Sequence, residues 1–177
     1  VTRTLAKLQG WAYSVSPGAV WVNLYGSSEL KTELPGGSPV RLVQKTDYPW
    51  DGKVTIQVQE AAAEPVALML RVPGWATRAA LQINGQPADA ELKPGTYATL
   101  RRRWSPGDVV ELDLPMDVVF LEAHPLVEEA HNQVAVMRGP IVYCLESPDL
   151  PEEVAVDDVA VVASAKWTPR WDNDLLG

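Results

Sequence analysis

Apolar and polar residues alternate with a period of two over most of this chain. Because successive side chains of a β-strand point to opposite faces, this alternation predicts half-buried strands. The clearest segments are residues 20–24, 54–58, 68–72, 81–83 and 110–114, with further candidates at 40–45, 97–103, 118–121, 134–137 and 141–145. So many short strands predict an all-β chain.

Turn residues separate these segments at roughly ten-residue intervals, which is typical of β-sandwiches. The chain contains 12 Gly and 15 Pro. Asn84-Gly85 is the best-specified turn, because Asn-Gly accepts the positive φ values of a tight hairpin. We therefore expect a jelly-roll-like antiparallel β-sandwich, with a hairpin joining residues 81–83 to the segment after Gln86.

One short helix is expected before the strands. Leu5, Leu8 and Trp11 recur at helical spacing, and an amphipathic helix needs a partner surface for its apolar stripe. We divide the chain into a helix at residues 1–16, a sandwich at 17–116 and the start of a second sandwich at 117–177. We expect both ends to be truncated, and the acidic stretch 146–158 to be a solvated connection.

The composition excludes several classes of partner. Lys and Arg total 15 against 23 Asp and Glu, so the net charge is −8 and phosphate backbones are repelled. Apolar runs are far too short to span a membrane. We expect a soluble chain with no nucleic-acid or membrane partner, and the sequence indicates no compartment.

The metal-binding and nucleophilic candidates are weak. The single cysteine, Cys144, lies in an apolar run and is expected to be buried and inert. His124 and His131 are seven residues apart, with Glu128 and Glu129 between them. A helix would place both imidazoles on one face for zinc, but Pro125 favours two surface histidines in a loop.

Charged residues near aromatic residues have two interpretations. Asp47 and Asp51 lie on either side of the sequence Tyr48-Pro49-Trp50. Two carboxylates beside aromatic residues could recognise a sugar or form the carboxylate pair of a glycosidase. Aspartate at a turn more commonly accepts hydrogen bonds from its own backbone, and we favour that interpretation. The run Arg101-Arg102-Arg103-Trp104 is expected to form ion pairs with neighbours such as Glu111 and Asp113.

Seven phrases together resemble the non-catalytic half of glycoside hydrolase family 127, the β-L-arabinofuranosidase family. The resemblance runs over nearly the whole chain, and no single phrase carries it alone. The phrases occupy residues 22–29, 46–52, 70–76, 83–85, 103–108, 114–116 and 136–146.

The resemblance implies an architecture and a chemistry. Family members have an N-terminal (α/α)6-barrel catalytic domain followed by β-sandwiches, and they hydrolyse terminal arabinofuranose with retention. Their nucleophile is a cysteine held on zinc by cysteines and a glutamate, and a separate glutamate has been discussed as the acid/base. Cys144 matches a sandwich phrase instead. No catalytic or zinc-binding residue of the family can be carried onto this chain, so zinc is expected only in the missing catalytic domain.

Two functions follow. In the first, the chain is an accessory, structural part of a family-127-like hydrolase, supports its own catalytic barrel and contributes a homodimer surface. In the second, it is a stand-alone carbohydrate-binding sandwich. The candidate sugar contacts are Trp50, Asp51 and Trp75, because exposed tryptophans in turns can stack on sugar faces. The alternative for both tryptophans is packing against the barrel or the core, which we favour.

Overall fold

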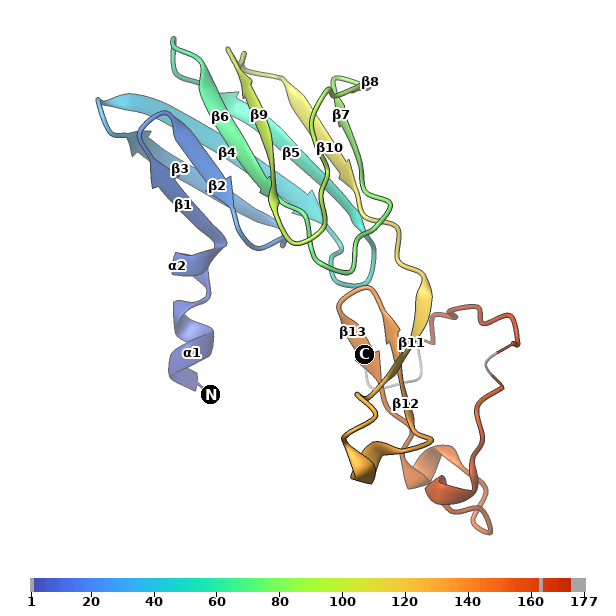
Figure 1. Ribbon diagram of the computed structural model, residues 1–177. Helices are drawn as coiled ribbons and strands as arrows, with labels where there is room; N and C mark the ends of the chain where they lie inside the picture. The colour runs from blue at the N-terminus through green and yellow to red at the C-terminus, as the bar shows by residue number, and fades with distance from the viewer. Residues whose placement is uncertain (1, 163, 173–177) are drawn as a thin grey trace. The chain divides into compact units, whose positions relative to one another are not determined.

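The computed structural model describes residues 2–162 and 164–172. The chain divides into two compact units, residues 1–116 and 117–177 (Figure 1). Each unit has its own sheet or sheets, and each is described below by itself.

The first unit contains two stacked β-sheets (Figure 1). The four-stranded sheet has the order β1-β2-β6-β9, and the six-stranded sheet has the order β3-β4-β5-β10-β7-β8. The first comprises β1 (Tyr13–Ser16), β2 (Ala19–Val22), β6 (Val66–Arg71) and β9 (Tyr97–Arg102). The second comprises β3 (Ser28–Leu34), β4 (Ser38–Thr46), β5 (Lys53–Glu60), β10 (Val109–Asp113), β7 (Ala80–Ile83) and β8 (Gln86–Pro87).

Antiparallel pairing dominates, and the predicted all-β antiparallel sandwich is confirmed. Strands β2 and β6 form a parallel pair. Between them the chain crosses to the other sheet and forms β3, β4 and β5 before returning. Parallel neighbours require such a long crossover connection, and a hairpin turn cannot join them.

The inward-facing residues of the two sheets form one hydrophobic core, which explains the period-two pattern. Val20, Leu68 and Leu70 of the smaller sheet are at most 1% exposed, and so are Leu42 and Ile56 of the larger sheet. Removing this apolar surface from water stabilises the fold by about 25 cal/mol per Å² buried.

The Asn84-Gly85 hairpin forms as predicted. Asn84 has φ 51° and Gly85 has φ 75°. Ile83 pairs with Gln86 across the turn, which joins β7 to β8. Positive φ at both central residues is the requirement that selects Asn-Gly in this kind of turn.

An N-terminal helix is present as two short segments, α1 (Thr2–Lys7) and α2 (Gln9–Ala12). Residues 13–16, which the predicted division assigned to the helix, form β1 instead. Leu8 is 40% exposed and Trp11 is 49% exposed. The side chain of Leu5, the third member of the predicted stripe, is not among those that the structure describes. The stripe residues that the structure does describe are therefore not covered by the sandwich.

The second unit is built on a three-stranded antiparallel sheet with the order β11-β12-β13. Its strands are β11 (Val118–Glu122), β12 (Val134–Arg138) and β13 (Ile141–Tyr143). Three single 3-10 turns accompany them: η1 (Glu128–Ala130), η2 (Ser147–Asp149) and η3 (Val156–Asp158). Two of these turns lie within the acidic stretch, which is exposed apart from the half-buried Leu150.

Candidate functional site

Trp50 and Asp51 lie in the loop between β4 and β5. The carbonyl oxygen of Asp47 accepts hydrogen bonds from the amides of Trp50 at 2.9 Å and Asp51 at 3.2 Å. The Asp51 carboxylate accepts a bond of 2.9 Å from the amide of Lys53. Asp51 therefore stabilises its own turn, whereas Trp50 leaves 55% of its surface exposed.

Trp75 faces the core more than it faces solvent. It is half-buried and packs against the hydrophobic core in the loop after β6. It lies beside Tyr48, whose ring meets Tyr25 edge-on at 5.8 Å between centroids. Burial raises the pKa of Tyr25 and of Tyr48 above the ordinary value of 10.0, at which a tyrosine hydroxyl is already protonated at neutral pH.

A polar depression of about 480 Å³ lies at the same end of the larger sheet. It brings Asp47 and Asp51 together with two lysines. The lining residues are Ser27, Lys45, Thr46, Asp47, Asp51 and Lys53. This depression offers hydrogen-bonding groups of both charges to a polar ligand, and aromatic side chains are not part of its lining.

The side chains of the two histidines form hydrogen bonds with the backbone of their own loop. A hydrogen bond of 2.8 Å joins His131 Nε2 to the carbonyl oxygen of Pro125, and the Leu126 amide donates to His124 Nδ1 at 3.2 Å. Residues Glu128–Ala130 form a single 3-10 turn, too short to align two imidazoles seven residues apart. Within residues 2–162 and 164–172, no three His, Cys, Asp or Glu side chains gather where they could hold a metal ion. The described residues therefore do not fit zinc.

The expectation that Cys144 is buried is wrong, because its thiol is exposed. The apolar run that contains it is typical of a core strand, but β13 ends at Tyr143 and is itself largely exposed there. Cys144 borders an apolar cleft of about 430 Å³ within the second unit, together with Arg138 and Trp167. Sequence could not show this, since exposure depends on what covers the sheet.

The prediction that the arginine run pairs with Glu111 and Asp113 is also wrong. Arg101 and Arg102 lie on β9 in the smaller sheet, whereas Glu111 and Asp113 lie on β10 in the larger sheet. Arg102 instead faces Asp108, whose carboxylate lies 4.0 Å from its guanidinium. The error arose because the chain changes sheets between the two strands, while Asp108 lies in the turn that connects them.

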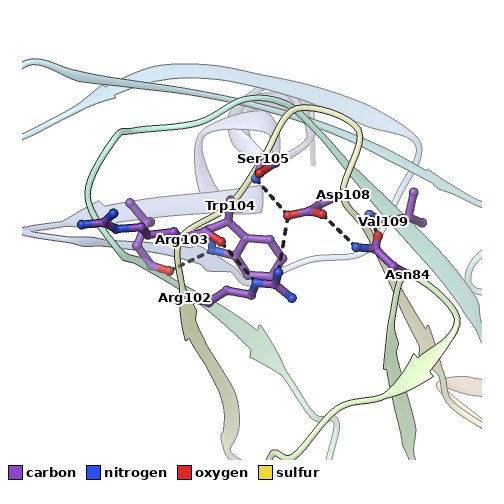
Figure 2. A network of polar contacts seen from close by, with 8 residues as sticks. Asn84, Arg102, Arg103, Trp104, Ser105, Asp108 and Val109 are labelled. Carbon is purple, nitrogen blue, oxygen red and sulfur yellow. Dashed lines mark hydrogen bonds and ion pairs between the residues drawn. The ribbon is translucent and has the colours of Figure 1, made fainter.

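Arg102 and Asp108 belong to a polar network that sequence reasoning did not assign a role (Figure 2). Asn84 Nδ2 donates to Asp108 Oδ1 at 2.8 Å, and the Ser105 amide donates to Asp108 Oδ2 at 2.9 Å. These two hydrogen bonds, followed by the charge of Arg102, hold the pKa of Asp108 below its ordinary value of 3.8. The only signal in the sequence was that both turns belong to phrases of the family resemblance.

Trp104 closes this end of the sandwich beneath the network. It is 7% exposed, and its indole donates a hydrogen bond of 2.9 Å to the carbonyl oxygen of Val66. The guanidinium of Arg102 lies over its ring at 5.3 Å from the centroid. The phrase at residues 103–108 thus supports the fold, because Trp104 packs in the sandwich and Asp108 accepts hydrogen bonds from its own turn and from Asn84.

Two family descriptions match consecutive parts of the chain. The GH127 middle domain, described as β-L-arabinofuranosidase, matches residues 19–116. The glycoside hydrolase family 127 C-terminal domain matches residues 118–171. The chain belongs to glycoside hydrolase family 127. Among residues 2–162 and 164–172, no helix has both the length and the apolar character to cross a membrane.

Curated and solved family members agree with this assignment. A non-reducing end β-L-arabinofuranosidase of Bifidobacterium longum subsp. longum is 34% identical over 185 residues, which is 100% of this chain and 27% of that protein. A solved glycoside hydrolase is 46% identical with a TM-score of 0.83, covering 88% of this chain and 26% of that chain.

A family-127 β-L-arabinofuranosidase from Geobacillus stearothermophilus has also been solved. It is 42% identical with a TM-score of 0.75, covering 81% of this chain and 22% of that chain. The family-127 chain therefore spans about a quarter of the length of the relatives it matches. It corresponds to the middle and C-terminal domains of a larger family-127 protein.

Proposed function

We propose that this chain is the accessory β-sandwich region of a glycoside hydrolase that acts on β-L-arabinofuranosides, and that it supports the catalytic barrel of that enzyme. One observation carries the proposal. Residues 19–116 match the family's middle domain and residues 118–171 match its C-terminal domain, while the chain spans only 27% of the length of its curated relative.

The N-terminal helix supplies the contact with the barrel in this proposal. The helical residues 2–12 belong to the last barrel helix, residues 13–116 form the middle sandwich, and residues 117–177 begin the C-terminal sandwich. Leu8 and Trp11 are 40% and 49% exposed. An amphipathic helix with an uncovered apolar stripe requires a partner, and neighbouring barrel helices would provide it.

Catalysis and zinc belong to the barrel in this proposal. A zinc-held cysteine nucleophile needs several thiolates about 2.3 Å from the metal. This chain has one cysteine, and its histidines are bonded to loop backbone. Its contribution is to hold the barrel helix, and with it the barrel, in a fixed orientation.

A direct sugar contact at Trp50 is the finer part of the proposal. Trp50 exposes 55% of its surface, and Asp51 lines the adjacent polar depression. The tryptophan ring would stack on a sugar face, as aromatic side chains do, and the Asp51 carboxylate would accept a hydrogen bond from a sugar hydroxyl. Trp75 contributes less in this proposal, because it is half-buried and packs on the core.

A chimera tests the accessory role. In the Bifidobacterium longum relative, the matching 27% is replaced by this chain, and hydrolysis of p-nitrophenyl β-L-arabinofuranoside is measured. The chimera should turn over substrate and bind zinc, whereas this chain alone should do neither. Turnover by the isolated chain, or one bound zinc per isolated chain, would contradict the proposal.

The helix contact is tested in the same chimera. Leu8→Asp should lower soluble yield and activity, because it places a charge in the helix–barrel interface. Leu126→Asp is the matched control, because Leu126 is 84% exposed in a loop of the second unit. If both variants lower activity equally, the helix is not the contact.

A further inference from the structure

The helical segment has almost no packing to hold it in place. Segments α1 and α2 contain six and four residues, and the described side chains of residues 2–11 are exposed. Isolated helices shorter than about 12 residues are marginal in water. The interactions that fix this helix must therefore act at its C-terminal end, where the chain enters β1.

Asn23, just after β2, binds the end of the helix. Its backbone amide donates to the carbonyl oxygen of Ala12 at 2.9 Å, and the Leu24 amide donates to the same oxygen at 3.3 Å. Its side-chain Nδ2 donates to the carbonyl oxygen of Trp11 at 3.1 Å. The last carbonyls of a helix lack partners within the helix, and here a strand end more than ten residues away supplies them.

The same amide group is fixed on the sandwich side. Asn23 Nδ2 also donates to the hydroxyl of Ser14 at 2.9 Å. Asn23 Oδ1 accepts a hydrogen bond of 2.8 Å from the hydroxyl of Tyr97, at the start of β9. The Tyr97 ring meets Trp21 of β2 edge-on, with centroids 5.0 Å apart. Both polar atoms of the amide are therefore engaged, one toward the helix and β1 and the other toward the smaller sheet.

We propose that Asn23 is a positioning residue that locks the N-terminal helix to the sandwich, so that the two move as one rigid body. Asparagine suits this role because one planar group donates to a helix carbonyl and accepts from a sheet hydroxyl. Aspartate would lack the donor, and alanine would lack both atoms. The consequence for the whole enzyme, a sandwich that sets the orientation of the barrel, rests on the proposed function.

The lock is tested in this chain by a distance measurement. Spin labels at Gln9→Cys and Glu111→Cys, in a Cys144→Ser background diluted with excess unlabelled chain so that only distances within one chain are measured, report the helix position relative to the sandwich by pulsed electron paramagnetic resonance. Both labelled residues are exposed. The labelled chain that retains Asn23 should give one narrow distribution of label-to-label distances, and Asn23→Ala should broaden that distribution.

A second readout covers the case in which Asn23→Ala folds poorly. Tyr97→Phe removes the hydroxyl that donates a hydrogen bond to Asn23 Oδ1, and it keeps the aromatic ring against Trp21. Hydrogen exchange of the Leu24 amide should then accelerate by about tenfold, the factor that corresponds to losing ~1.4 kcal/mol of hydrogen bonding. Exchange in the central core strands should not change.

Asn84→Ala is the matched control, since it removes an asparagine network at another turn of the sandwich. It should lower stability without broadening the distance distribution. The proposal is overturned if the unmodified chain already gives a broad distribution, if Asn23→Ala leaves it narrow, or if Asn84→Ala broadens it equally. These outcomes do not depend on the chimera, so failure of the lock and failure of the accessory role are distinguishable.

Discussion

Asn84 donates a hydrogen bond of 2.8 Å to Asp108 across 24 residues of sequence. Asn84 Oδ1 also accepts from the amide of Val109 at 2.8 Å. One asparagine therefore shapes its own hairpin and fastens it to the turn before β10. The phrases at residues 83–85 and 103–108, which carry part of the family resemblance, encode this single contact.

The Asp108 network should make stability depend on pH. The pKa of Asp108 is lowered in the folded protein, mainly by Asn84 and the Ser105 amide. Its contribution is present above the unfolded value near 3.8 and is lost as pH falls through the lower folded value. Asp108→Asn should therefore lower Tm at pH 7, and the difference from the unmodified chain should shrink below about pH 4.

Asp113→Asn is the control for this titration, because Asp113 is exposed on β10 and lies outside the network. Thermal unfolding followed by circular dichroism from pH 2 to pH 7 gives the comparison. A constant Tm difference across that range would show that the Asp108 charge does not stabilise the network.

Gly52 should not tolerate any side chain. A Cβ at this position would overlap the backbone carbonyl of Leu114, and the Leu114 amide donates to the Gly52 carbonyl at 3.0 Å. Because both groups are backbone in a paired region, relaxation is costly, and Gly52→Ala should destabilise by about 3 kcal/mol or more. Gly74→Ala, where the Cβ would meet open space, should change stability by less than about 1 kcal/mol. Urea unfolding of both variants decides the point.

Gly85 is constrained by its backbone conformation alone. Its φ is +75°, and no neighbouring atom lies within 4 Å of the position that a Cβ would occupy. Gly85→Val should therefore cost on the order of 1–2 kcal/mol through left-handed strain. Gly74→Val has the same open surroundings without a positive φ and serves as the control. Equal Tm values for the two variants would contradict this explanation.

The two candidate sugar-contact tryptophans should differ in stability. Trp50 exposes 55% of its surface, so Trp50→Ala should change the free energy of unfolding by less than about 1 kcal/mol. Trp75 packs on the core, so Trp75→Ala should cost about 3 kcal/mol. Titration with arabinofuranosyl oligosaccharides, followed by fluorescence, then tests the contact. Binding that survives Trp50→Ala would exclude Trp50 as the stacking residue.

The isolated chain should associate through its uncovered helix. The exposed Leu8 and Trp11 side chains gain from burial against a second copy when no barrel is present. We expect a dimer in light scattering and a monomer after Leu8→Asp. A monomeric unmodified chain would show that the stripe does not self-associate.

Local patterns predicted much of this fold because local rules govern it. Period-two alternation located the core strands, and Asn84-Gly85 located its hairpin, since both depend on neighbours in sequence. The helix at the N-terminus followed from the spacing of Leu8 and Trp11. The Asp51 carboxylate likewise accepts a hydrogen bond from the Lys53 amide within its own turn, as expected for an aspartate at a turn.

The errors came from relations that depend on how the strands are arranged into sheets and on what covers them. Arg102 was expected to pair on β10 but pairs with Asp108, because the chain changes sheets in between. Cys144 was expected in a core, but burial requires a covering layer that its own strand does not encode. Neither relation leaves a periodic signal.

The sequence by itself determined the strands, the turns, the acidic charge and the family. The tertiary structure decided which residues the asparagines of the family phrases meet. Asn84 reaches Asp108 once β7 pairs with β10, and Asn23 reaches both Trp11 and Tyr97 once the strands of the smaller sheet have assembled and brought their ends together. Side-chain hydrogen bonds operate within about 3 Å, so their partners are set by the packed fold and not by spacing along the chain.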